Sequence, residues 1–175
     1  MDVPDTDVLV VGGGPAGLAA AIAVRRKGLS VVVADAGVPP IDKACGEGLM
    51  PDALRALAGL GVEIPTDAGL AFYGIRFWGE DVSVEAEFPL GFGLALRRTM
   101  LHQILANAAE QAGVELHWGA PVGELSDVKA RWIIGADGQG SRVRKWAGLD
   151  RWRRVRERLG FRVHYRVAPW TDHVE

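Results

Sequence analysis

The sequence has little of several features that define other classes of protein. Its 175 residues include one cysteine, Cys45, so no disulfide can form within the chain and a reducing, cytoplasmic location is expected. The net charge of -2 gives no overall attraction to nucleic acid or to an anionic membrane. No apolar run approaches the roughly 20 residues that cross a bilayer, so we expect no transmembrane segment. The acidic start, residues 1–6, is not typical of a signal peptide.

Patterns typical of metal sites and of hydrolases are also missing. The four histidines have no metal-ligand spacing with Cys45, so we predict no metal site: His102, His117, His164 and His173. No Ser-His-Asp order stands out, and the catalytic residues stay unknown. A basic stretch over residues 142–158 contains two tryptophans. The slightly negative overall charge favours a solvated rim over a nucleic-acid site.

The chain begins with a strand, a glycine turn and a helix. An apolar strand over residues 7–11 precedes Gly-Gly-Gly-Pro-Ala-Gly at 12–17, and an alanine-rich helix comes next. Gly12 allows the sharp turn, Gly14 lets the backbone approach a pyrophosphate, and Gly17 lets the helix pack against the sheet. The helix would direct its N–H groups and positive dipole end at the phosphates. We therefore predict a dinucleotide site that includes these glycines together with Pro15 and Ala16.

A second strand completes this unit. The helix ends in basic residues and Gly28, and residues 29–34 form an apolar strand that ends at Asp35. An acid about 20 residues beyond the glycines is placed to hold a ribose hydroxyl. We therefore predict that Asp35 binds the nucleotide.

In the rest of the chain the spacing of apolar residues alternates between helical and strand-like patterns. Helical patterns cover 51–58, 101–112 and 141–147, and further strands are expected at 114–118, 130–134 and 160–167. Residues 71–96 alternate with period two, which predicts antiparallel strands at 72–78, 82–88 and 92–96. The predicted fold is α/β, a Rossmann-like parallel sheet flanked by helices with part of an antiparallel sheet. We assign 1–70 and 97–150 to the Rossmann-like domain that would bind the dinucleotide, and 71–96 and 151–175 to an incomplete substrate-side sheet.

Two further segments carry a family resemblance. Residues 135–144, Gly-Ala-Asp-Gly-Gln-Gly-Ser-Arg-Val-Arg, together with the glycine turn and Asp35, resemble FAD-dependent oxidoreductases of the para-hydroxybenzoate hydroxylase type. Residues 43–49, Lys-Ala-Cys-Gly-Glu-Gly-Leu, with Pro51, are more similar to the geranylgeranyl reductases and flavin-dependent halogenases of that superfamily. The resemblance extends from residue 7 to about 168 and implies FAD as the cofactor.

The resemblance also implies roles for single residues. Asp137 and Gly138 would contact the flavin nucleotide and a nicotinamide donor, and Cys45 and Gly46 would lie along the flavin ring. The backbone of Val122 would contact the adenine.

Arg98 is a separate case. An arginine at a helix start faces the unfavourable dipole end, which pairing with a phosphate would explain. The family pattern falls on Arg98 rather than on its neighbour Arg97.

We predict an FAD-dependent oxidoreductase, first of all a monooxygenase that uses NAD(P)H and O₂ to hydroxylate a small organic substrate. A reductase of isoprenoid double bonds is the alternative, favoured by residues 43–49. A halogenase is disfavoured because no Trp-x-Trp-x-Ile-Pro segment occurs. A non-catalytic FAD-binding fragment is the third hypothesis. Members of the family are longer, so a missing C-terminal portion or a partner chain is expected to complete the site.

Overall fold

The computed structural model describes residues 5–65, 67–124, 128–150 and 159–175. These residues form two compact units. The first comprises residues 1–42 and 101–158, and the second comprises residues 43–100 and 159–175. Residues 151–158, the end of the basic stretch, lie outside the described ranges. Within those ranges, no helix has both the length and the apolar character needed to cross a membrane.

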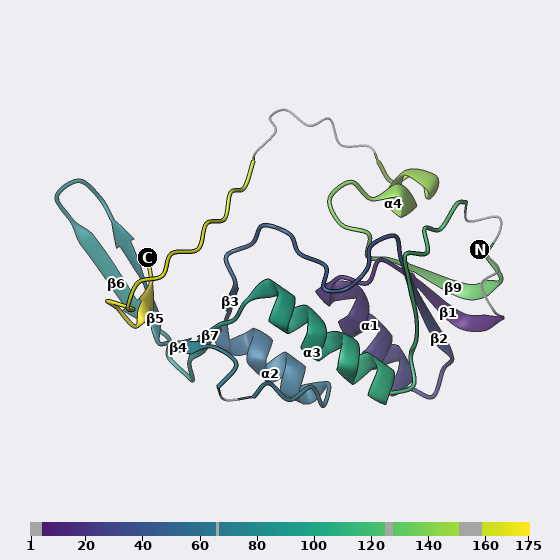
Figure 1. Ribbon diagram of the computed structural model, residues 1–175, viewed down its shortest axis with the longest axis horizontal. Coiled ribbons are helices and arrows are strands. Elements are labelled where there is room, and N and C mark those ends of the chain that lie inside the picture. The colour runs from purple at the N-terminus through teal and green to yellow at the C-terminus, as the bar shows by residue number, and fades with distance from the viewer. Residues whose placement is uncertain (1–4, 66, 125–127, 151–158) are drawn as a thin grey trace. The chain divides into compact units, whose positions relative to one another are not determined.

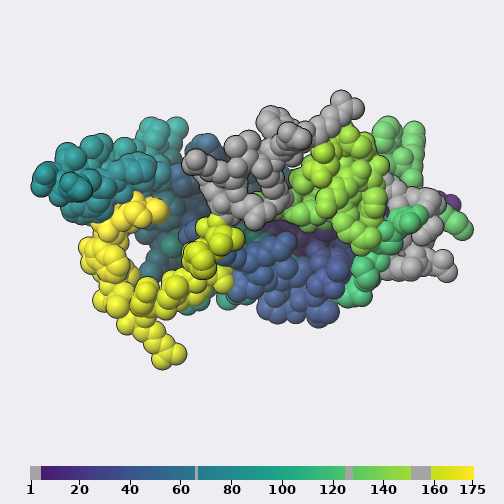
Figure 2. Space-filling view, turned by 90° about the horizontal axis from the view of Figure 1, so that it is seen from above, coloured from purple at the N-terminus to yellow at the C-terminus, as the bar shows by residue number. Residues whose placement is uncertain are grey.

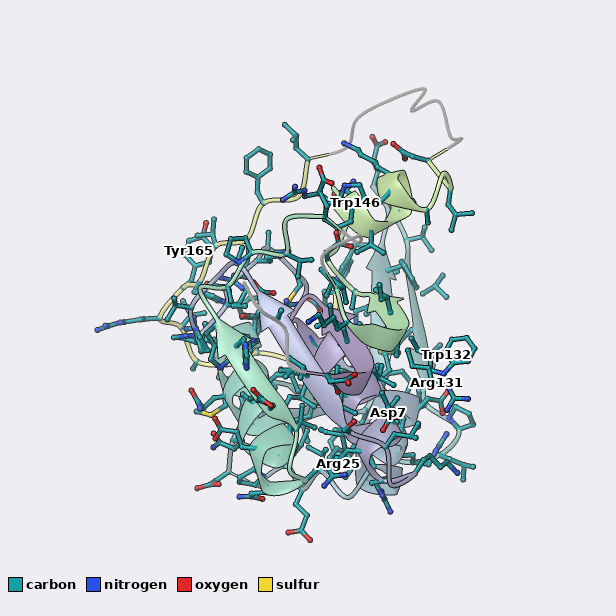
Figure 3. The ribbon with its side chains drawn as sticks, turned by 90° about the vertical axis from the view of Figure 1, so that its right-hand side faces the viewer. Asp7, Arg25, Arg131, Trp132, Trp146 and Tyr165 are labelled. Carbon is teal, nitrogen blue, oxygen red and sulfur yellow. The ribbon has the colours of Figure 1, made fainter. Side chains whose placement is uncertain are left out.

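A parallel sheet forms the centre of the first unit (Figure 1). Its strand order is β8 (Glu115–Trp118), β2 (Val31–Asp35), β1 (Thr6–Val11) and β9 (Ala130–Gly135). Strand β1 pairs on both sides, so its apolar run is buried from end to end. Strand β9 is at the sheet edge, where Trp132 is 62% exposed and points away from the sheet in Figure 3.

Helices cover both faces of this sheet. Helix α1 (Pro15–Arg25) contacts β1 and β2 and buries Leu18, Ala21 and Ile22. On the other face, a core cluster that includes Leu9 and Val32 is covered in part by α4 (Arg142–Trp146). Helix α3 (Arg98–Gln111) contributes residues from Leu101 on to the first unit and buries four of them: His102, Leu105, Ala106 and Ala109. Helices on two faces of a parallel sheet define the doubly wound architecture.

The second unit contains two small sheets. In one, β7 (Gly93–Ala95) pairs antiparallel with both β3 (Gly48–Leu49) and β4 (Leu70–Phe72). Helix α2 (Pro51–Gly59) contacts β3 and β7. A side chain at Gly93 would collide with the ring of Phe72, so the glycine lets this aromatic residue lie across the strand.

The other sheet is a hairpin with one added strand. Strand β5 (Gly74–Trp78) pairs antiparallel with β6 (Ser83–Glu87) and parallel with β10 (His173–Val174). The guanidinium of Arg76 on β5 pairs with Glu85 on β6 and with Glu175, the residue after β10, at 2.7 Å each.

The predicted fold class, a parallel sheet flanked by helices plus antiparallel sheet, is confirmed. Two local predictions are wrong. The strand expected at 72–78 is two strands in different sheets, because the chain changes sheet at Tyr73, whose N–H donates to Asp172.

Residues 160–167 do not form the predicted strand, because among the described residues no strand lies beside this segment to make backbone hydrogen bonds with it. Its alternate apolar side chains, Phe161, Val163 and Tyr165, are 87%, 66% and 78% exposed. In the space-filling view the segment is a narrow strip that stands out from the surface (Figure 2). Alternating apolar residues indicate that one face of a strand could be buried, but a strand also needs a neighbouring strand whose backbone pairs with its N–H and C=O groups.

Candidate dinucleotide site

The glycine turn lies at the carboxyl end of β1 and packs too tightly for side chains. Gly12 has φ +108°, and a Cβ there would collide with the carbonyl of Ala136. A Cβ on Gly17 would collide with the carbonyl oxygen of Gly12. Gly14 caps α1 and Pro15 opens it, so the N–H groups of the first helical turn are directed toward the end of the sheet. The roles predicted for Gly12 and Gly17 in the backbone turn therefore have a direct geometric basis.

Asp35 supports this turn. Its Oδ2 accepts a hydrogen bond from the N–H of Gly13 at 2.6 Å, and its Oδ1 accepts from the N–H of Gly37 at 2.7 Å. A carboxylate has about four lone-pair sites, so these two bonds leave capacity for the ribose hydroxyl predicted for Asp35. The side chain thus has a second role that spacing alone did not reveal, because it fixes the glycine loop before any nucleotide arrives.

Two residues that sequence analysis did not assign to the site lie under the loop. The fully buried imidazole of His102 donates from Nε2 to the carbonyl oxygen of Gly13 at 2.9 Å. Its ring packs at 5.5 Å from the indole of Trp118, and a Cβ on Gly13 would collide with that indole. A histidine on the apolar face of a helix was the available sequence signal, but its partner is 89 residues away.

The Asp137–Gly138 turn comes after β9 and precedes α4, whose N-cap is Ser141. The Asp137 carboxylate accepts hydrogen bonds from the Ser141 hydroxyl and from the N–H groups of Arg142 and Val143. Burial raises the pKa of Asp137, but the bonds from Ser141 and the two backbone groups outweigh it, so the pKa is lowered. Gly138 has φ +82°, as a tight turn requires. Because a Cβ on Gly12 would lie 2.8 Å from the Asp137 nitrogen, the two predicted loops are adjacent.

Val122 is buried in the core beside Leu9 and Val32. This packing explains why an apolar side chain occupies this position. The adenine contact predicted for it concerns its backbone and stays a prediction.

Arg98 begins α3 in the second unit and is only partly exposed. Its Nε is buried and makes no hydrogen bond to any described residue. Its backbone N–H donates to Oε1 of Glu47 at 2.7 Å. Arg97, by contrast, is exposed and donates to Nδ1 of His164. A buried guanidinium nitrogen with no acceptor among the described residues has the capacity to donate to an anion, and the phosphate contact predicted for Arg98 stays a prediction.

Glu47 is the centre of a charged cluster in the second unit. Its side chain is 13% exposed and accepts from Arg162 at 2.9 Å and from Nε2 of His164 at 2.6 Å, in addition to Arg98. Burial raises the pKa of Glu47, but the Arg98 N–H, His164 and Arg162 together lower it. Its φ of +55° is rare for a residue with a side chain. Cys45 and Gly46, just before it, are exposed, and a Cβ on Gly46 would meet no atom within 4 Å.

Two structural observations, one within each unit, suit the binding of a dinucleotide cofactor. The cradle formed by Gly12, Gly13 and Gly17 admits backbone but no side chain, which suits close approach to a pyrophosphate. The buried Nε of Arg98 has hydrogen-bonding capacity that the described residues do not use. The predicted site residues divide between the units: Cys45, Gly46 and Arg98 belong to the second, and the others to the first.

Comparison with known proteins identifies the family. Residues 5–124 match the model of the FAD binding domain, and the chain belongs to this family. Menaquinone reductase of Mycobacterium tuberculosis is 33% identical over 202 aligned residues, which cover 100% of this chain and 49% of the relative. Menaquinone reductase of Mycolicibacterium smegmatis is 38% identical over 124 residues, 69% of this chain and 30% of the relative.

Two further matches widen the comparison. Digeranylgeranylglycerophospholipid reductase 1 of Methanothermobacter thermautotrophicus is 33% identical over 85% of this chain and 43% of its own length. Among solved structures, 2-methyl-3-hydroxypyridine-5-carboxylic acid oxygenase has a TM-score of 0.70 and 29% identity, covering 83% of this chain and 43% of that one. The chain therefore spans less than half the length of these relatives.

Proposed function

We propose that this chain is the FAD-binding part of a flavin-dependent reductase that saturates double bonds in a polyprenyl substrate. The observation that carries the proposal is the match to menaquinone reductase, at 33% identity over the whole of this chain and 49% of the relative. Digeranylgeranylglycerophospholipid reductase, matched over 85% of the chain, is named for a substrate with the same kind of apolar chain. The proposal thus favours the reductase predicted from residues 43–49 over the monooxygenase.

The residues of this chain would bind and orient the cofactor. The Gly12–Gly17 turn and the first turn of α1 would hold the pyrophosphate, with Asp35 on the ribose and Arg98 on a phosphate. Asp137 and Gly138 would form the second contact, and Cys45 and Gly46 would line the flavin ring. FAD, once bound, supplies hydride transfer, and the protein supplies binding, orientation and exclusion of water. We further propose NAD(P)H as the electron donor and a cytoplasmic location.

A monooxygenase is the second candidate, because a solved oxygenase matches with a TM-score of 0.70 at 29% identity. Both candidates need the same FAD site, so the geometry of the glycine turn does not separate them. They differ in the step after flavin reduction: the reductase passes hydride to carbon, whereas the monooxygenase needs O₂.

The first experiment is a visible spectrum of the purified chain mixed with FAD and freed of excess. A flavin band that stays with the protein and is released on denaturation supports the proposal. A colourless protein that cannot be reconstituted contradicts it for this chain.

The second experiment uses a longer protein that contains this chain, reduced with NADPH and supplied with a polyprenyl quinone. A product that gains two hydrogens per double bond without O₂ supports the reductase. A product that forms only with O₂ and gains one oxygen atom supports the monooxygenase.

A further inference from the structure

Glu47 connects three segments of the second unit that are distant in sequence. It lies in the loop that contains Cys45 and Gly46, its Oε1 accepts from the N–H of Arg98 at the start of α3, and its Oε2 accepts from His164 in the C-terminal segment. The last pair is separated by 117 residues. One carboxylate therefore joins the loop predicted to line the flavin, the predicted phosphate-binding arginine and the segment around 164.

The network extends beyond the carboxylate. His164 donates from Nε2 to Glu47, so its Nδ1 is the acceptor that receives Arg97 at 2.6 Å. Arg162 binds Glu47 at 2.9 Å and also donates to the carbonyl of Lys43 at 3.2 Å. Side chains from 162 and 164 thus hold both ends of residues 43–47. Charge-assisted bonds of this kind are about twice as strong as neutral ones.

The backbone conformation of Glu47 is one that favours glycine, so the glutamate side chain must make contacts that offset the strain. With φ at +55°, glycine would be the least strained residue. A glutamate in this conformation costs roughly 1 kcal/mol or more, and its contacts must offset that cost. The contact with Arg98 is the one that concerns the predicted phosphate site. It fixes the backbone of the first residue of α3, while the Arg98 Nε has no acceptor among the described residues.

We propose that Glu47 is a positioning residue for FAD: through the N–H of Arg98 and through His164 it sets the direction of the Arg98 guanidinium and the path of the 43–49 loop. The inference rests on the proposed function, since it concerns the same cofactor. It adds that the segment around His164 controls cofactor affinity without contacting the cofactor.

The test combines two variants of Glu47 with a matched control. Glu47→Gly removes the carboxylate and relieves the backbone, so a loss cannot come from strain. Glu47→Gln keeps an acceptor for the Arg98 N–H but loses the charge. Glu85→Gln is the control, because Glu85 also pairs with an arginine in the second unit, at 2.7 Å from Arg76, and lies outside the network.

The first measurement is the dissociation constant of FAD for the whole chain. We expect Glu47→Gly to weaken FAD binding about tenfold, Glu47→Gln less, and Glu85→Gln less than about twofold. Arg98→Ala should also weaken binding, but should add little in the Glu47→Gly background, because the arginine has already lost its orientation. Fully additive losses, or unchanged affinity in Glu47→Gly, would overturn the positioning role while the proposed function stands.

The second measurement needs no cofactor. Hydrogen exchange at the Arg98 amide should accelerate in Glu47→Gly and in His164→Ala, and not in Glu85→Gln. An unchanged exchange rate in both variants refutes the network itself. If the wild-type chain binds no FAD while exchange at the Arg98 amide still accelerates in the two variants, the proposed function and the positioning role are both contradicted. The hydrogen-bond network itself is then established.

Discussion

The imidazole of His102 donates from Nε2 to the carbonyl oxygen of Gly13 across 2.9 Å in the interior of the first unit. This bond supports the dinucleotide loop from below, while Asp35 holds the N–H of the same residue. Both polar groups of Gly13 are therefore fixed by side chains, and the stability of the loop should depend on each of them.

Replacing the buried histidine should destabilise the protein even without FAD. His102→Ala removes a buried ring and leaves the Gly13 carbonyl unsatisfied, so we expect the free energy of unfolding to fall by about 2–4 kcal/mol. His102→Gln places an amide donor near the position of Nε2 and should recover part of the loss. Urea denaturation monitored by circular dichroism measures both. The control is His117→Ala, on β8 at the edge of the sheet, where the partly exposed ring pairs, among the described residues, only with Glu115, so we expect a loss of less than about 1 kcal/mol.

Asp35 should affect stability as well as nucleotide binding. Asp35→Ala leaves the N–H of Gly13 and of Gly37 without their acceptor, so we expect the free energy of unfolding to drop by about 1–3 kcal/mol in the absence of FAD. Thermal denaturation of the cofactor-free chain measures it. If Asp35 contacted only the ribose, the cofactor-free variant would have the same midpoint of thermal unfolding as the wild type.

Gly17 should not accept a methyl group. In Gly17→Ala the new Cβ would collide with the Gly12 carbonyl, so α1 must move away from β1. We expect a loss of roughly 2–3 kcal/mol in the free energy of unfolding, with loss of FAD binding. The matched control is Gly59→Ala, also in a helix, where a Cβ meets no atom within 4 Å. There the helix propensity of alanine should add up to about 1 kcal/mol of stability.

The lowered pKa of Asp137 predicts a dependence on acid. The folded chain holds this carboxylate ionised more strongly than the unfolded chain, whose carboxyl has the ordinary pKa of 3.8. Its contribution to stability is therefore complete above that value and is lost as the pH falls through the lower folded pKa. Asp137→Asn should be less stable than wild type near neutral pH, and the gap should narrow below about pH 4. Unfolding curves across this range measure the gap; a constant difference would contradict the prediction.

Local sequence predicted the parts of the fold that depend on local geometry. The glycine turn, the two strands around it and the helix after it are determined by neighbouring residues, and the four-stranded parallel sheet confirms the class. The strand predicted at 160–167 is wrong, because alternation in Phe161, Val163 and Tyr165 says nothing about whether a partner strand is present.

The missed parts of the candidate site are the long-range ones. Spacing suggested a nucleotide role for Asp35 but did not reveal its bond to Gly13. The contacts of His102 with Gly13 and of Glu47 with His164 join residues 89 and 117 positions apart, and no periodic pattern encodes them. A single histidine or glutamate in a sequence does not by itself indicate a site, so only the folded chain shows its role.

The indole of Trp118 packs against Gly13, where a side chain would collide with it. The chain thus contains an intrinsic fluorophore beside the loop expected to receive a yellow, light-absorbing cofactor. Emission from Trp118, isolated by replacing the other five tryptophans with phenylalanine, would report occupancy of that loop directly.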